Sequence, residues 1–409
     1  MRGSLPWRAC WCSGRQRCAP GTRCPWSYQT WAYTNGLFEG FGLALTGPVA
    51  AAFGAFLSGR LTPPTRPYAQ PKFARGTARF LVQNLAPAVL VVTSAYLLAL
   101  LPVVVQTYRT ATAGSLDPVT AVSGVLVLNT LLVAGWLIGL FAQSAFAAPV
   151  AFGAAFAATL VGYGVNTWNA VTPVTADLGV VGLVETPAFQ TFRLSFFFVV
   201  LIVALLTAGA VLTGRDFDRR PPPVRVAVLW LLPAAFLAAG IGHPPAAIKR
   251  ETSPPRVCRD VNGMQFCMHK AHERDLEPLA GEVAPIIALV GKENLPFDRV
   301  HDWSLSDGRT PPADSTVFYA DASPKYGVVG VGGQIADQVA GIYECAARPG
   351  REESEQGFNS FMLSLRLNGD REDRPDNRFG PLSDSQLRQW LAEHRSRVTS
   401  CDITNDLLP

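Results

Sequence analysis

Six apolar stretches constrain the fold of this chain more than any other feature. They cover residues 37–57, 80–108, 118–143, 146–166, 194–214 and 226–242. An α-helix rises ~1.5 Å per residue, so about 20 apolar residues cross the ~30 Å hydrocarbon core of a bilayer. Residues 118–176 contain no Asp, Glu, Lys or Arg, whereas a soluble helix carries charges on its outer face. We therefore predict about six transmembrane helices, with the lipid bilayer as their partner.

The two parts of the chain differ in charge. Residues 1–242 contain 16 Lys and Arg against 6 Asp and Glu, and residues 243–409 contain 19 against 25. The basic excess lies in a tail and in short loops beside predicted spans, where it sets membrane orientation. It therefore does not indicate nucleic-acid binding.

Two basic clusters predict the orientation, because short loops rich in Lys and Arg stay in the cytoplasm. They lie between the first and second spans and between the fifth and sixth: Arg60, Arg66, Lys72, Arg75, Arg79, Arg215, Arg219, Arg220 and Arg225. Alternation of the spans then places the loops 107–117 and 167–193, which contain only Arg109 and Arg193 as basic residues, outside. Everything after residue 242 is outside as well. Abundant Arg, Ala, Gly and Pro are typical of GC-rich bacteria, so we expect a multi-pass protein of a bacterial cell membrane.

We expect three segments. Residues 1–30 form an irregular basic tail or a mis-assigned start, because they lack the apolar run of a signal peptide and their four Cys lack the spacing of a zinc site. Residues 31–242 form an all-α transmembrane domain. Residues 243–409 follow a Pro-rich linker and form an α-rich α+β extracytoplasmic domain, large enough for its own core.

The pattern of the last segment predicts its elements. We expect a hairpin at 257–268, a strand at 316–320, and helices near 272–291, 332–347, 356–367 and 383–399. The last helix begins with Ser383 and Gln386 at the spacing of a capping box. Asn262-Gly263 is the strongest two-residue hairpin signal, and it places Cys258 opposite Cys267 at ~4.5 Å between Cα atoms.

The hairpin register predicts one disulfide directly and a second by elimination. Outside the cell Cys258 and Cys267 would form a disulfide, which leaves Cys345 to pair with Cys401. The alternative is four reduced, buried thiols.

Two motifs could be mistaken for chemical sites. His269 and His272-Glu273 lack the second histidine of the zinc-protease motif His-Glu-x-x-His, so we interpret them as exposed polar residues at a helix start. The glycines from Gly327 to Gly333 lack the Lys-Ser/Thr ending of a phosphate-binding loop, so we interpret them as a turn into a helix. We therefore expect no catalytic residue, metal ligand or cofactor, and we do not expect an enzyme.

The spans themselves contain few polar groups. Glu39 is a lone carboxylate near the outer end of the first span, where such a group is usually solvated. No span has an ionisable residue near its middle, as an ion-coupled transporter would need. If the protein moves a substrate, the energy would come from another subunit.

Several short runs resemble a known family. The runs 47–53 (GPVAAAF), 58–60 (SGR) and 75–77 (RGT) look like those of type-2 ATP-binding-cassette transporter permeases. The whole chain, with the runs 267–269 (CMH) and 271–272 (AH), resembles actinobacterial permease-like membrane proteins with a C-terminal extracytoplasmic domain.

The resemblance implies partners and a contact surface. Residues 58–79 would face a cytoplasmic ATPase through Arg60, Lys72, Arg75 and Arg79, and the subunit would pair with itself or with another permease subunit. The resemblance also implies that the span 37–57 is the second span of the family. The family's acidic residue after the Gly-Thr pair is replaced here by Ala78-Arg79.

Two functional hypotheses follow. In the first, the chain is a permease-like transport subunit that works with a separate ATPase. In the second, it is a receptor or scaffold whose spans only anchor the outer domain. The amphipathic basic segment at 70–80 favours the first.

Overall fold

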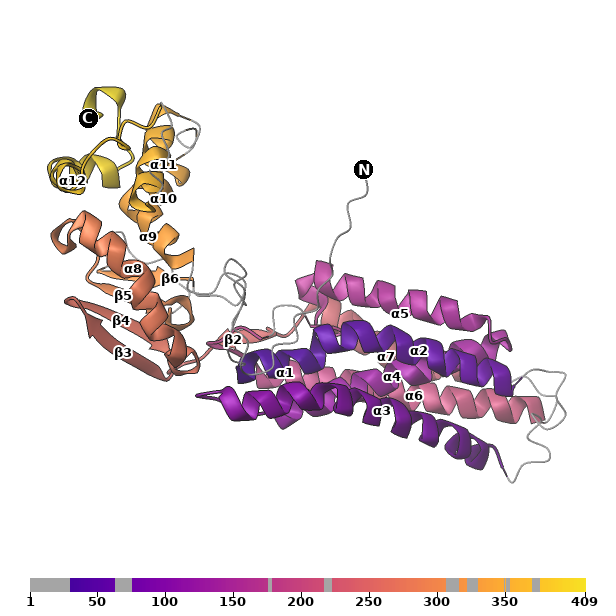
Figure 1. The fold of residues 1–409 in the computed structure, drawn as a ribbon. Helices are drawn as coiled ribbons and strands as arrows, with labels where there is room; N and C mark the ends of the chain where they lie inside the picture. The colour runs from indigo at the N-terminus through magenta and orange to yellow at the C-terminus, as the bar shows by residue number, and fades with distance from the viewer. Residues whose placement is uncertain are drawn as a thin grey trace, which may run out of the picture.

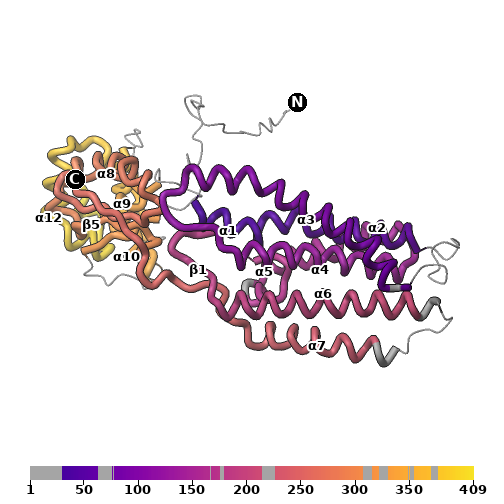
Figure 2. Tube along the Cα trace, turned by 90° about the horizontal axis from the view of Figure 1, so that it is seen from below, coloured from indigo at the N-terminus to yellow at the C-terminus, as the bar shows by residue number. Residues whose placement is uncertain are grey.

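The computed structural model describes residues 30–62, 76–175, 179–216, 223–306, 316–321, 330–348, 350, 354–369 and 376–409. These residues form a bundle of long helices with a smaller α+β domain at one end of it (Figure 1). A view turned by 90° shows the same arrangement (Figure 2). We call the end of the bundle that meets the α+β domain the junction end, and the opposite end the loop end.

The apolar stretches form the bundle. Its helices are α1 (Trp31–Glu39), α2 (Phe41–Leu61), α3 (Thr77–Thr110), α4 (Pro118–Ala142), α5 (Ala147–Gly164), α6 (Pro187–Asp216) and α7 (Pro223–Gly242). Within the described residues, five helical stretches are long and apolar enough to span a membrane, with α1 and α2 counted together. The chain is therefore a multi-pass membrane protein by length and composition. The sixth predicted span forms α7, whose described apolar stretch, Val226–Gly242, is shorter.

The start of α6 differs most from the prediction. The predicted span begins at residue 194, but the helix begins at Pro187 and includes Arg193. Arg193 is fully buried. It therefore belongs to a helix and not, as predicted, to an outer loop.

The bundle is held by close contacts of backbones. Helix α4 lies at its centre. In an apolar stretch of 18 residues, 61% of the residues of α4 are buried, compared with 11% for α3. A Cβ atom on Gly135 of α4 would lie 1.9 Å from the carbonyl oxygen of Ala51 in α2. Small residues of this kind let membrane helices approach closely, so that dispersion contacts and hydrogen bonds can hold them. The hydroxyl of Ser58 donates to the carbonyl of Trp136, 2.6 Å away, across the same interface.

The α+β domain contains one four-stranded sheet. Its strands are β3 (Arg256–Val261), β4 (Met264–His269), β5 (Arg299–Asp302) and β6 (Val317–Ala320), in the order β3-β4-β5-β6. The first pair is antiparallel and the other two pairs are parallel. The hairpin has the predicted register, with Cys258 opposite Cys267. The strand β5 was not predicted.

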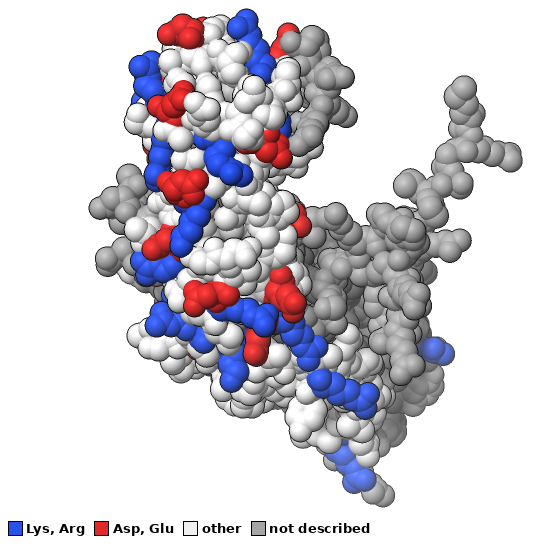
Figure 3. Space-filling model, turned by 60° about the vertical axis from the view of Figure 1, so that its left-hand side comes forward, with Lys and Arg blue, Asp and Glu red and all other residues white. Residues whose placement is uncertain are grey.

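Helices pack with this sheet around one hydrophobic core. They are α8 (Leu276–Val290), α9 (Val331–Val339), α10 (Ile342–Ala346), α11 (Glu355–Leu367) and α12 (Asp384–Thr399). The capping box of Ser383 and Gln386 is present. The predicted helix 332–347 is broken at Gly341, whose φ of 76° suits glycine and whose Cβ would lie 2.1 Å from the carbonyl oxygen of Val398. Charges of both signs are interspersed over the face of the domain that Figure 3 shows, as expected for a solvated surface.

Residues on the two sides of the predicted boundary at residue 242 pair with one another. Strand β1 (Leu183–Glu185) comes from the chain between α5 and α6, and it pairs with β2 (Ile248–Arg250), which follows α7. The segment predicted as a linker therefore contributes strand β2 to a small sheet, and the bundle contributes the other strand, β1. Thr112 adds a hydrogen bond to the carbonyl of Lys270, at 2.6 Å.

Both predicted disulfides are present in the structure. Cys258 and Cys267 are bonded with 4.1 Å between their Cα atoms, and Cys345 and Cys401 with 5.1 Å. The first links β3 with β4. The second ties α10 to the end of α12.

The two disulfides should differ in their effect on stability. Replacing Cys345 and Cys401 with Ser should lower the free energy of unfolding by ~2–5 kcal/mol. Replacing Cys258 and Cys267 should lower it less, because the bonded residues are 9 apart in sequence rather than 56. Urea unfolding of the non-reduced protein, followed by tryptophan fluorescence, measures both. A larger loss for the hairpin pair would contradict this expectation.

Candidate functional site

The structure describes only half of the predicted ATPase-facing residues. Arg60 and Arg79 are exposed near the loop end, where α2 ends and α3 begins. The guanidinium of Arg60 lies 6.0 Å from the ring centre of Phe56. Lys72 and Arg75 lie outside the described residues, so the loop remains a prediction from sequence.

His269 and His272 of the α+β domain are buried and not exposed as predicted. His269 ends β4 and accepts a hydrogen bond from the backbone amide of Ala271, and its Nε2 lies 3.2 Å from a carboxylate oxygen of Glu251. His272 lies in a 3-10 turn, with Nδ1 2.7 Å from a carboxylate oxygen of Asp302. The histidine motif could not predict these contacts, because both carboxylates belong to other parts of the chain.

Burial and hydrogen bonds set the charge of these groups. Burial lowers the pKa of His269, which favours the neutral imidazole. Burial would raise the pKa of Asp302, but hydrogen bonds from His272 and Ser304 outweigh it and lower that pKa. Among the described residues, no three His, Cys, Asp or Glu side chains are grouped to hold a metal ion.

These side chains lie at the carboxyl ends of parallel strands. His269 ends β4 and Asp302 ends β5. Ligands of open sheets with parallel strands commonly bind outside this edge. Here the edge faces the junction end of the bundle.

A buried ion pair organises the bundle side of the junction. The Nε atom of Arg193 lies 3.2 Å from a carboxylate oxygen of Glu39, and both side chains are at most 1% exposed. The same guanidinium donates to the carbonyls of Asn169, Thr172 and Pro173 at 2.6–2.8 Å. The interpretation of Glu39 as a solvated carboxylate was therefore wrong. One signal was available, because lone opposite charges beside apolar segments tend to pair.

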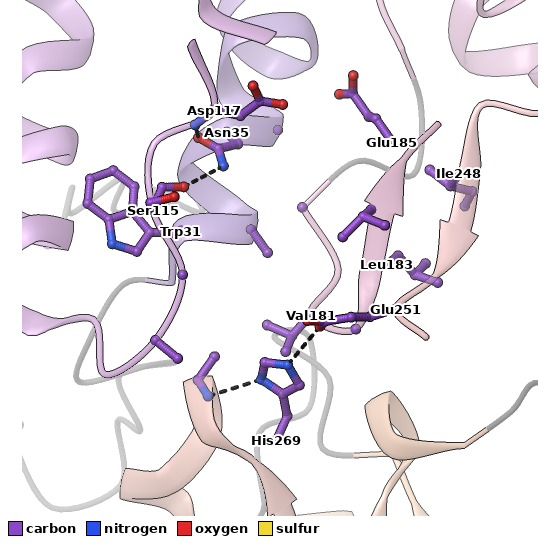
Figure 4. A pocket seen from close by; sticks show the side chains of 18 of the residues that line it. Trp31, Asn35, Ser115, Asp117, Val181, Leu183, Glu185, Ile248, Glu251 and His269 are labelled. Atoms are coloured by element: carbon purple, nitrogen blue, oxygen red, sulfur yellow. Dashed lines mark hydrogen bonds and ion pairs between the residues drawn. The ribbon is translucent and has the colours of Figure 1, made fainter. Parts of the chain in front are cut away.

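A cavity of about 290 Å³ lies between the bundle and the α+β domain. Figure 4 shows Trp31 and Asn35 of α1, with Ser115 and Asp117, on one side. The strands β1 and β2 form the other side, and His269 lies at the bottom of the view. The side formed by these strands presents Val181, Leu183, Glu185, Ile248 and Glu251.

Three carboxylates line the cavity, and no Lys or Arg is among its lining residues. Asp117 caps α4 by accepting from the amide of Val119 at 2.9 Å, and it also accepts from Gln190 at 2.8 Å. One oxygen of Glu185, Oε2, is buried and has no hydrogen-bond partner among the described residues. Glu251 contacts His269 as above. The lining therefore favours positively charged ligand groups and disfavours anions.

Burial raises the pKa of Glu185 from 4.5 to about 8, and the charge of Glu39 adds to this effect. The side chain of Gln190 and the charge of Arg193 act in the opposite direction, and Asp117 adds a smaller repulsion. At neutral pH and without a ligand, the protonated form of Glu185 is therefore favoured. A cation placed beside it would favour loss of that proton.

The pH dependence of stability should reveal the protonation of Glu185. Because the folded-state pKa exceeds the unfolded value, the contribution of Glu185 is complete below about pH 4.5 and is lost as pH rises through about 8. The melting temperature of the protein in detergent should therefore fall between about pH 5 and pH 9, and Glu185→Gln should reduce that fall.

Thermal unfolding, followed by tryptophan fluorescence at several pH values, measures how steeply the melting temperature falls with pH. Glu277→Gln is the matched control, because the Glu277 side chain is 87% exposed. Equal slopes for the wild type and Glu185→Gln would contradict the assignment.

Comparisons with known proteins add no identification. No protein-family model, no curated protein and no solved structure matches the chain. The functional argument therefore rests on the geometry of the junction and on the sequence.

Proposed function

We propose that this chain is a permease-like subunit of a membrane transport complex, with the α+β domain outside the cell and the loop end facing a cytoplasmic ATPase. The observation that carries the proposal is the attachment of the α+β domain to the bundle. The β1–β2 sheet takes one strand from each side of α6 and α7, so a displacement of these helices reaches the domain. A domain that was merely anchored would need only a flexible link.

Two observations support the orientation. Arg60 and Arg79 are exposed near the loop end, and short Lys- and Arg-rich loops are retained in the cytoplasm. Both disulfides lie in the α+β domain at the other end, and disulfides persist in oxidising compartments.

The surface of α3 supports a partner within the membrane. This helix spans Thr77–Thr110, and only 11% of its apolar window is buried. Its exposed side would contact lipid or a second permease subunit. A pair of such subunits, identical or different, is the assembly that we propose.

A second candidate function is a receptor or scaffold whose spans serve as an anchor. The close packing at the centre of the bundle favours it, because Gly54 and Gly135 already leave no space for a methyl group. Such packing resists the sliding of helices that alternating access requires. Whether an ATPase accompanies the protein separates the two candidates.

The orientation can be tested by labelling. A single cysteine at Asp376, introduced into a variant without the native cysteines, should react with an impermeant maleimide in intact cells. A cysteine at Lys72 should react only after the membrane is made permeable. Labelling of the Lys72 position in intact cells would overturn the orientation.

The ATPase contact can be tested by reversing charge. Changing Lys72, Arg75 and Arg79 to Glu should abolish co-purification of an ATP-binding-cassette ATPase, because the basic loop would no longer attract the partner surface. Quantitative mass spectrometry of the purified complex measures this loss.

The control for charge reversal changes Arg259 and Arg299 to Glu, because these side chains in the α+β domain are 59% and 43% exposed. It should leave co-purification unchanged. Unchanged co-purification in the loop variant, at normal membrane levels, would favour the receptor.

A further inference from the structure

We propose that the junction cavity binds an elongated organic cation with two amino groups. One ammonium group lies between Asp117 and Glu185, and the other lies beside Glu251. The site does not depend on the transport proposal, because its residues belong to the junction and not to the loop end.

The charge of the lining favours a cation. Asp117, Glu185 and Glu251 all line the cavity, without a Lys or Arg among the lining residues. The nearby Arg193 is fully buried and already bonded to Glu39 and three backbone carbonyls. Its charge is therefore committed to those groups. Asp117 already accepts hydrogen bonds from Val119, Thr120 and Gln190, and Glu251 contacts His269. An ionised carboxylate offers about four acceptor sites, so both groups can still accept a hydrogen bond from a ligand.

The carboxylates lie at two ends of the cavity. Figure 4 shows Asp117 and Glu185 facing one another at one end, and Glu251 with His269 at the other. A single metal ion needs its ligands gathered at one point, and the described residues contain no such group of three. Two separated anionic ends fit a ligand with two separated positive charges.

The wall between the two ends is suited to a hydrocarbon chain. Val181, Leu183 and Ile248 line it from the strand side, and Trp31 lines the opposite side. The indole ring can also attract an ammonium group through its π-electrons. The volume of about 290 Å³ is near the lower limit of small-molecule pockets, about 300 Å³, which suits a short linear diamine.

One carboxylate oxygen of the cavity lining is buried without a hydrogen-bond partner among the described residues. The Oε2 atom of Glu185 is buried and has no hydrogen-bond partner among the described residues, although buried carboxylate oxygens normally accept a hydrogen bond. An ammonium group in the cavity beside Glu185 would add a donor for this carboxylate. At the other end, burial lowers the pKa of His269, so a neutral imidazole leaves the charge of Glu251 for the ligand.

Isothermal titration calorimetry on the purified full-length protein tests the site with two probes. The first is 1,5-diaminopentane, and the second is pentylamine, which has the same chain but one charge. The diamine should bind at least about tenfold more tightly, since it makes a second charge-assisted hydrogen bond. Equal affinity for both probes, or no binding of the diamine, would overturn the proposal.

Variants assign each ammonium group to one end. Glu251→Gln should weaken diamine binding about tenfold and leave pentylamine binding unchanged, because the single ammonium occupies the end with two carboxylates. Asp117→Asn should weaken the binding of both probes, and the amide can still cap α4. The control variant Glu277→Gln should bind both probes as the wild type does.

Two further readouts separate the site from a metal site and from general charge attraction. Diamine binding should release a proton from Glu185, so the measured enthalpy should change with the ionisation enthalpy of the buffer in the wild type and not in Glu185→Gln. Millimolar Mg²⁺ should not displace the diamine beyond the effect of ionic strength. Specific displacement by Mg²⁺, or a diamine affinity that none of the three cavity variants changes, would overturn the assignment.

Discussion

The buried ion pair of Arg193 and Glu39 is the interaction on which the junction depends. It places two opposite charges, each at most 1% exposed, in the apolar bundle. Removing one partner from a buried pair typically costs about 3–5 kcal/mol, because the other charge is left uncompensated. Arginine suits this position since its planar guanidinium can donate to a carboxylate and to several carbonyls together.

The geometry of this pair determines where the cavity walls lie. Arg193 is six residues after the start of α6 at Pro187, just beyond strand β1, and Glu39 is the last residue of α1. The carbonyls that Arg193 bonds belong to the chain between α5 and α6. One side chain therefore fixes α1, α6 and the approach to β1 together. The α+β domain joins this rigid base through β2.

The cavity follows from combining two kinds of surface. The bundle contributes the start of α1 and the cap of α4, where polar groups remain near apolar helices. The opposite wall comes from strands β1 and β2, and His269 at the end of β4 completes it. Neither unit encloses the space alone. A cation held between them would therefore stabilise one relative position of domain and bundle, which is the property that transport and signalling both require.

The sequence by itself determined the local features of this protein. Apolar stretches of membrane length predicted the helices of the bundle, Asn262-Gly263 predicted the hairpin register, and that register paired Cys258 with Cys267. These signals are readable because each depends on residues within a single helix or a single hairpin. The tertiary structure alone decided the contact of Glu39 with Arg193, 154 positions apart, and the contacts of the two histidines with distant carboxylates. Such pairs have no period or spacing in the sequence, since their partners are set only when helices and strands pack.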